Sequence, residues 1–155
     1  MITLNHIRVC SGNEDEDRNI LSDVNVTFSP QAGMIGILGA RKSGKTTLIS
    51  LLAGTMKPDA GFITCTGSVS WLMSSMRPLV QNMTVRANIR FIGMLYGVDI
   101  SVLRHEVSMF AGLHDVMDTR LNELPRDIQA HLVYCLCLCL KFDYYLADES
   151  FLIGD

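Results

Sequence analysis

Apolar and polar positions along the chain predict an alternation of strands and helices. Period-two alternation and short apolar runs predict strands at residues 2–9, 23–28, 34–38, 62–65, 68–71 and 144–147. Residues 34–38 are apolar without interruption, which is typical of a central strand buried on both faces. Residues 144–147 have the same character. Strands that alternate with helices in this way favour an α/β fold with a largely parallel central sheet.

Helical spacing appears in four segments. The first covers residues 46–53 and stops at Gly54, and the last covers residues 125–141 and is apolar nearly all round. The second starts at a Thr84 cap, ends at Gly97, and places four residues on one face: Val85, Ile89, Ile92 and Tyr96. The third is capped by Ser101 and carries one apolar stripe: Leu103, Val107 and Phe110. We therefore expect a single domain over residues 1–155, with a helical part at about 84–140.

Composition narrows the class of protein. The chain has 155 residues, of which 48% are hydrophobic and 19% charged, and its mean hydropathy is +0.26. This hydropathy is high for a free domain and indicates a surface meant for a partner, or an open core. With 13 basic and 16 acidic residues, the net charge of -3 argues against a nucleic-acid partner.

The same composition guides the expected location. The longest apolar run, residues 132–140, is too short for a membrane-spanning helix, and the N-terminus does not resemble a secretory signal. We expect a cytosolic chain with reduced thiols. Cys135, Cys137 and Cys139 match no common zinc-binding spacing, so we expect them to pack in the core.

The strongest chemical motif follows the apolar run at residues 34–38. It fits the pattern G-x-x-x-x-G-K-[ST] in full: Gly39, Ala40, Arg41, Lys42, Ser43, Gly44, Lys45 and Thr46. Gly39 and Gly44 let backbone N–H groups approach and wrap phosphates, and the helix N-terminus adds to the field. Lys45 would reach the β- and γ-phosphates, and the Thr46 hydroxyl would bind Mg²⁺. Thr47, the next residue, completes the expected ATP site; the alternative is a chance glycine-rich turn.

A metal-binding carboxylate is expected on a neighbouring strand. Residues 144–147 are followed by Asp148 and Glu149. Asp148 would hold Mg²⁺, and Glu149 would orient or polarise the attacking water as the catalytic base, with Lys45 as its catalytic partner. The alternative interpretation is an exposed strand end that happens to be acidic.

Together these residues resemble the ATP-binding subunits of ABC transporters, and more narrowly the bacterial exporters of capsular and related polysaccharides. Three further stretches carry the resemblance: residues 67–71, 84–99 and 142–149. Gly154 and Asp155 are similar to the end of the family's D-loop. The resemblance implies a P-loop NTPase fold of the ABC ATPase type, in which an N-terminal antiparallel β part precedes the parallel sheet and the helical part.

The resemblance also implies partners and a mechanism. Two ATP-binding subunits would close head to tail over two ATP molecules, each site combining one subunit's phosphate loop with the other's signature loop. Closure would drive a membrane subunit, which places the chain on the cytoplasmic face of the inner membrane. Gln81 is the local candidate for the metal-sensing glutamine of the family.

The chain differs from the family at three places. Residues 123–129 stand where the family has a serine- and glycine-containing signature loop, and they contain Pro125 and Asp127 instead. Cys10 stands where an aromatic residue stacks on adenine. The sequence ends at Asp155, before the switch histidine, so we expect a fold that is incomplete after the strand at 144–147.

Three functions therefore stay open at this point. The first is the ATP-binding subunit of a polysaccharide-export ABC transporter. The second is a nucleotide-binding or structural module without turnover, which the altered signature loop favours. The third is a soluble small-molecule kinase that uses the same phosphate loop.

Overall fold

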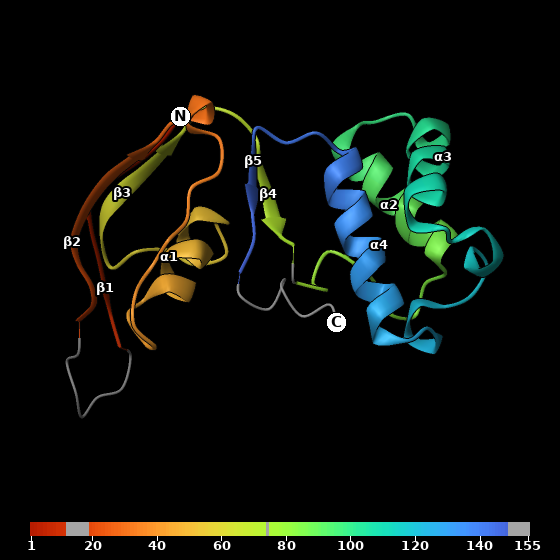
Figure 1. Ribbon diagram of the computed structural model, residues 1–155, viewed down its shortest axis with the longest axis horizontal. Coiled ribbons are helices and arrows are strands. Elements are labelled where there is room, and N and C mark those ends of the chain that lie inside the picture. Colours follow the sequence, from red (N-terminus) through yellow and green to blue (C-terminus); the bar gives the residue numbers. More distant parts are fainter. Residues whose placement is uncertain (12–18, 74, 149–155) are drawn as a thin grey trace. The chain divides into compact units, whose positions relative to one another are not determined.

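The computed structural model describes residues 1–11, 19–73 and 75–148, which fall into two compact units. The first unit comprises residues 1–72 and 143–148, and the second comprises residues 73–142. Figure 1 shows the division of elements: the strands β1–β5 and helix α1 belong to the first unit, and helices α2–α4 belong to the second. Helices α2–α4 lie within residues 84–140, and the expected organisation as a single domain with a helical part stays a prediction.

An antiparallel sheet forms one part of the first unit. It contains β1 (Ile2–Cys10), β2 (Asn19–Phe28) and β3 (Ala60–Cys65), in the order β2-β1-β3. Leu4 lies opposite Val26 on one side and Ile63 on the other. The apolar core beneath this sheet is formed by Ile2, Leu4, Ile7, Val9, Leu21 and Leu51. Helix α1 (Lys45–Leu52) contributes Leu51 to that core.

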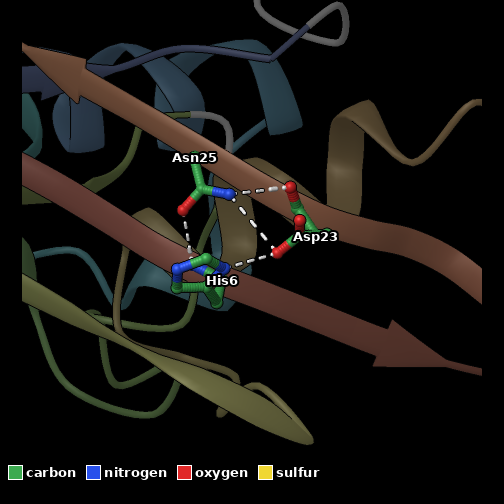
Figure 2. Close-up of polar contacts among 3 residues, drawn as sticks. All are labelled: His6, Asp23 and Asn25. Carbon is green, nitrogen blue, oxygen red and sulfur yellow. Dashed lines mark hydrogen bonds and ion pairs between the residues drawn. The ribbon is translucent and has the colours of Figure 1, made fainter.

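A bulge in β1 keeps its apolar residues on one face. The spacing of buried positions changes from two to three between Leu4 and Ile7, where the register with β2 also shifts. His6 and Asp23 have φ angles of 50° and 53° and face each other across the bulge, with 2.7 Å between His6 Nδ1 and Asp23 Oδ1. Figure 2 shows Asn25 completing this contact: its Oδ1 accepts from the His6 backbone N–H at 2.8 Å.

A parallel pair of strands completes the first unit. It consists of β4 (Val69–Leu72) and β5 (Tyr144–Leu146). Asp143 holds the two strands together, because its Oδ2 accepts from the backbone N–H and the hydroxyl of Ser68 at 2.6 and 2.9 Å. The hydroxyl of Ser70 in turn accepts from the Leu146 backbone N–H at 2.9 Å. The expected parallel arrangement is therefore present in this pair.

The prediction of a buried central strand at residues 34–38 is wrong. Met34 and Leu38 are 99% and 96% exposed, and among the described residues no strand pairs with this segment. An apolar run becomes a central strand only when strands on both sides satisfy its backbone N–H and C=O groups. The composition of residues 34–38 suits such a position, but the pairing partners decide whether it forms.

The second unit is a helical assembly. It contains α2 (Val85–Tyr96), α3 (Ile100–Ala111) and α4 (Arg126–Cys139), and the short 3₁₀ turns at His114–Val116 and Leu121–Glu123; a third such turn, Pro30–Ala32, lies in the first unit. The predicted stripes are confirmed in part. Val85, Ile89, Ile92, Leu103 and Val107 are buried, whereas Tyr96 and Phe110 are 43% and 73% exposed. Both lie near the ends of their helices, and the ring of Tyr96 contacts that of Phe142 edge to face, with 5.5 Å between the ring centroids.

The helix starts confirm one predicted cap and correct another. Thr84 caps α2, since its hydroxyl oxygen accepts from the Ala87 N–H at 3.1 Å. The prediction that Ser101 caps the next helix is wrong, because Asp99 is the cap of α3. Its Oδ1 accepts from the backbone N–H groups of Ser101 and Val102 at 2.8 and 3.2 Å, so the helix begins earlier. The Asp99 carboxylate accepts from two amides of the first turn, whereas Ser101 already lies inside that turn and cannot act as its N-cap.

The cysteines of α4 have the packing role predicted for them. Cys135 and Cys137 are buried at 3% and 0% exposure among Leu132, Val133 and Leu136. Burial raises the pKa of the Cys139 thiol to about 11. Burial raises the pKa of the Cys135 thiol as well, so neither Cys135 nor Cys139 has the character of a reactive thiolate. In the described segments no helix is long and apolar enough to cross a membrane.

Candidate nucleotide-binding site

The loop before α1 closes against strand β2. Gly44 is the N-cap of α1 and has a φ of 89°, in the left-handed region that glycine adopts without strain. A methyl group on Gly44 would lie 2.9 Å from Leu21 Cδ2 and 3.0 Å from the carbonyl oxygen of Ile20. Both the backbone angle and the close approach to β2 therefore require glycine here, as the motif predicts.

The side chain of Lys45 curls the loop into a ring. Its ammonium donates to the carbonyl oxygens of Gly39 and Ala40 at 2.9 and 3.0 Å. The Ser43 backbone N–H donates to the Ala40 carbonyl at 3.2 Å, which closes a turn inside the ring. A methyl group on Gly39 would lie only 2.5 Å from Ser43 Oγ. The structure thus brings Gly39, Ala40, Ser43 and Lys45 together as the motif predicts.

The first turn of α1 suits an anion. Gly44 has no side chain that could accept from the amides of this turn, and the first N–H groups of a helix have no partner within it. Thr46 is exposed and Thr47 is half-buried at this end. The helix dipole adds partial positive charge at the same place. Backbone amides, helix end and ammonium together form a donor set that fits a polyphosphate.

Two further cations lie on the loop. Arg41 and Lys42 are exposed, and neither forms an ion pair with another residue that the structure describes. Lys42 has a φ of 64°, a left-handed conformation that costs a residue with a Cβ about 1 kcal/mol. The motif leaves this position unspecified, so nothing in the sequence indicates the strained backbone. The charge on the loop, by contrast, can be seen in the sequence.

The predicted metal-binding residues are placed in both units. Asp148 lies two residues beyond β5, is half-buried and belongs to the same unit as the phosphate loop. Gln81 belongs to the second unit. Glu149, Gly154 and Asp155 lie outside the described residues. Residues 39–47 therefore form the structurally defined core of the site, and the roles of Asp148, Glu149 and Gln81 stay predictions.

The segment around Gln81 is fixed by a residue that the sequence does not mark as important. Asn88 of α2 is fully buried, and its Oδ1 accepts from the Val80 backbone N–H at 2.7 Å. Its Nδ2 donates to the carbonyl oxygens of Val80 and Thr84 at 3.0 and 3.1 Å. The Gln81 carbonyl accepts from the Asn122 N–H at 3.0 Å. A polar residue on an otherwise apolar helix face is the signal that could have revealed this role.

Two departures from the expected pattern are visible in the structure. Cys10 ends β1, and its backbone N–H donates to Asp59 Oδ2 at 2.7 Å. At the start of α4, Pro125 is the N-cap and offers no side-chain acceptor, while Asp127 places a carboxylate in the first turn. The Gln129 side chain donates to the Leu124 carbonyl at 2.8 Å. This helix start therefore differs in chemistry from that of α1.

Comparison with known proteins decides the family. The sequence model of the ABC transporter family matches residues 21–152. This range is most of the chain and includes the phosphate loop. The chain belongs to the ABC transporter family. It is 32% identical over its whole length to the capsule polysaccharide export ATP-binding protein CtrD of Neisseria meningitidis. It is 35% identical over 84% of its length to the ATP-binding protein BexA of Haemophilus influenzae.

Further relatives agree with this assignment. The polysialic acid transport ATP-binding protein KpsT of Escherichia coli is 28% identical over 88% of the chain. The chain spans 71%, 61% and 63% of the lengths of CtrD, BexA and KpsT. The solved structures include an ATP-binding cassette in a dimeric, post-hydrolysis state bound to ADP and Pi. It superimposes on all of this chain with a TM-score of 0.81 at 17% sequence identity, and the match covers 76% of the cassette. This likeness confirms the predicted ABC ATPase fold.

Proposed function

We propose that this chain binds Mg·ATP at residues 39–47 and acts as the ATP-binding subunit of an ABC transporter that exports capsular or related polysaccharide. The observation that carries the proposal is the start of α1. A glycine cap, a ring of loop backbone and the Lys45 ammonium meet there. The names of the relatives CtrD and KpsT support polysaccharide as the exported class.

The residues of the loop have distinct roles in this proposal. Backbone N–H groups of the loop hold the phosphates, and Lys45 transfers its ammonium from the carbonyls of Gly39 and Ala40 to phosphate oxygens. The Thr46 hydroxyl and the Asp148 carboxylate would hold Mg²⁺. That ion neutralises charge on the phosphates when bound. Glu149 would orient the attacking water, and Gln81 would sense the metal.

The partners follow from the family. We infer a membrane subunit and a second ATP-binding subunit that pairs head to tail with this one, on the cytoplasmic face of the inner membrane. Relatives are named as export and transport ATP-binding proteins, which supports a membrane partner. The exposed apolar side chains Met94 and Leu95 of α2 are consistent with a chain that works in an assembly.

A second candidate function is a nucleotide-binding module without turnover. The observation that favours it is the start of α4, where Pro125 lacks a backbone donor and Asp127 would repel phosphate. Such a helix end is poorly suited to hold the γ-phosphate of a partner subunit. ATP binding by the chain's own loop is unaffected by this difference.

Titration of Mg·ATP into the intact chain tests the proposed binding site. Lys45→Ala removes the ammonium from the ring, and we expect binding to weaken by about 100-fold, or about 3 kcal/mol. Lys57→Ala, which removes an exposed lysine from the turn after α1, should bind as the wild type does. Equal affinity of wild type and Lys45→Ala would remove the phosphate-loop assignment.

Phosphate release separates the two candidate functions. Turnover that disappears in Glu149→Gln supports the ATPase, whereas binding without release supports the module without turnover. An Asp148→Asn variant should bind ATP with a weaker response to Mg²⁺. If the Mg²⁺ response is unaltered, Asp148 is not a metal ligand.

A further inference from the structure

Lys42 has an unusual position within the phosphate loop. Its φ of 64° lies in the left-handed region, which a glycine would occupy without strain. Four non-glycine residues among those described have a positive φ: His6, Asp23, Lys42 and Lys141. The first two support each other through a side-chain contact, and Lys141 ends a helix, where left-handed residues are common. At Lys42 the left-handed backbone belongs to the turn that the Ser43 N–H closes on the Ala40 carbonyl, at a position that favours glycine.

The charges on the loop are used unequally. The Lys45 ammonium is held by the carbonyl oxygens of Gly39 and Ala40. Arg41 and Lys42 are both exposed and form no ion pair with the residues that the structure describes, but only Lys42 has a left-handed backbone. A strained residue with an uncommitted charge, inside a loop that fits a polyphosphate, is placed to meet the ligand. The left-handed backbone of Lys42 costs stability, and attraction between its ammonium and a bound phosphate would offset that cost.

We propose that Lys42 is a second phosphate-binding cation that raises the affinity for nucleoside triphosphate over diphosphate. The inference rests on the proposed function, because it requires ATP at residues 39–47. A triphosphate carries more negative charge than a diphosphate, so an additional ammonium on the loop attracts it more strongly. The contact is exposed to solvent and is therefore weakened by salt.

Three substitutions separate charge from backbone strain. Lys42→Asn removes the charge and tolerates a left-handed backbone, and Lys42→Gly removes both the charge and the strain. Lys42→Arg retains the charge and the strain. Mg·ATP and Mg·ADP are titrated into the intact chain at low and high KCl. We expect Asn and Gly to weaken ATP binding about fivefold and ADP binding by less than about twofold, with Arg close to wild type.

Lys141 supplies a matched control. It is an exposed lysine with a φ of 53° at the end of α4, outside the phosphate loop. Lys141→Gly makes the same change in charge and backbone freedom as Lys42→Gly, and it should leave both nucleotide affinities unchanged. Thermal unfolding of each variant shows whether the fold is retained.

The outcomes distinguish this inference from the proposed function. If Lys42→Asn and Lys42→Gly bind ATP as tightly as wild type, or more tightly, Lys42 is not a phosphate ligand, even where Lys45→Ala still weakens binding as proposed. An equal loss for ATP and ADP, or a loss that high salt does not reduce, also overturns the proposal. If the wild type binds no nucleotide, both the inference and the proposed function fail. A selective, salt-sensitive loss of ATP affinity supports it.

Discussion

Helices α1 and α2 both begin after a tight loop, but their first turns are satisfied in opposite ways. At α2 the Thr84 hydroxyl accepts from the Ala87 N–H, and Asn88 reaches back to both backbone groups of Val80. At α1 the cap is Gly44, which has no side chain to accept from the amides of the first turn, and the Lys45 ammonium donates to loop carbonyls. The comparison shows that the chain's own side chains cap the first turn of α2, whereas no side chain caps the first turn of α1.

The start of α3 sharpens the contrast. There Asp99 supplies the chain's own anion, with Oδ1 accepting from the N–H groups of Ser101 and Val102. A carboxylate at this position does for α3 what a phosphate would do for α1. Among these three helix starts, only that of α1 combines a cap without a side chain with a lysine in its first turn.

The largest effect is expected from breaking the closed start of α2. Asn88→Leu removes the acceptor of the Val80 N–H and two side-chain hydrogen bonds to the carbonyls of Val80 and Thr84, and this should lower the free energy of unfolding by about 3 kcal/mol. Urea unfolding followed by helical circular dichroism measures this. Asn122→Ala, at an exposed position, should change it by less than about 0.5 kcal/mol. Similar values for both variants would contradict the role given to Asn88.

Much of this architecture could be predicted from the sequence. Local patterns determine the strands of the antiparallel sheet, the helices, the Thr84 cap and the phosphate-loop ring. The motif specifies Gly39, Gly44 and Lys45 because each has a backbone or charge role that few other residues can fill. The ring and the Thr84 cap depend on contacts between residues close in sequence, and periodicity records where strands and helices form, although not which strands pair.

Features that depend on distant partners could not be predicted. Residues 34–38 have the composition of a central strand but no pairing partner among the described residues. Phe110 fits the apolar stripe of α3, yet its exposure depends on which elements pack beside it. The φ of Lys42 is a local feature that could not be predicted for another reason, since the motif accepts any residue at this position and so does not indicate its backbone angle.

A smaller effect is expected from filling the open start of α1. Gly44→Ala forces a Cβ against Leu21 and the Ile20 carbonyl at a φ of 89°, and should cost about 2 kcal/mol in stability. Because the same loop binds phosphate in our proposal, ATP affinity should fall as well. Gly54→Ala has a similar φ of 67° but open space around it, so it should cost about 1 kcal/mol and leave ATP affinity intact. Thermal unfolding with and without Mg·ATP compares the two variants; an equal loss of ATP affinity in both would contradict the closure against β2.

The smallest effect is expected at the start of α3, where the capping group, the Asp99 carboxyl, can be protonated by lowering the pH. Hydrogen bonds from the Ser101 hydroxyl and then from the Val102 and Ser101 amides lower the pKa of the Asp99 carboxyl below its ordinary value. Its contribution to stability is therefore complete above about pH 4 and is lost as the pH falls through the lowered pKa. Asp99→Asn keeps a capping acceptor that does not titrate, so its unfolding midpoint should fall less steeply than that of the wild type between pH 5 and pH 2. Parallel midpoints across this range would mean that the carboxylate does not act as the anion of this helix start.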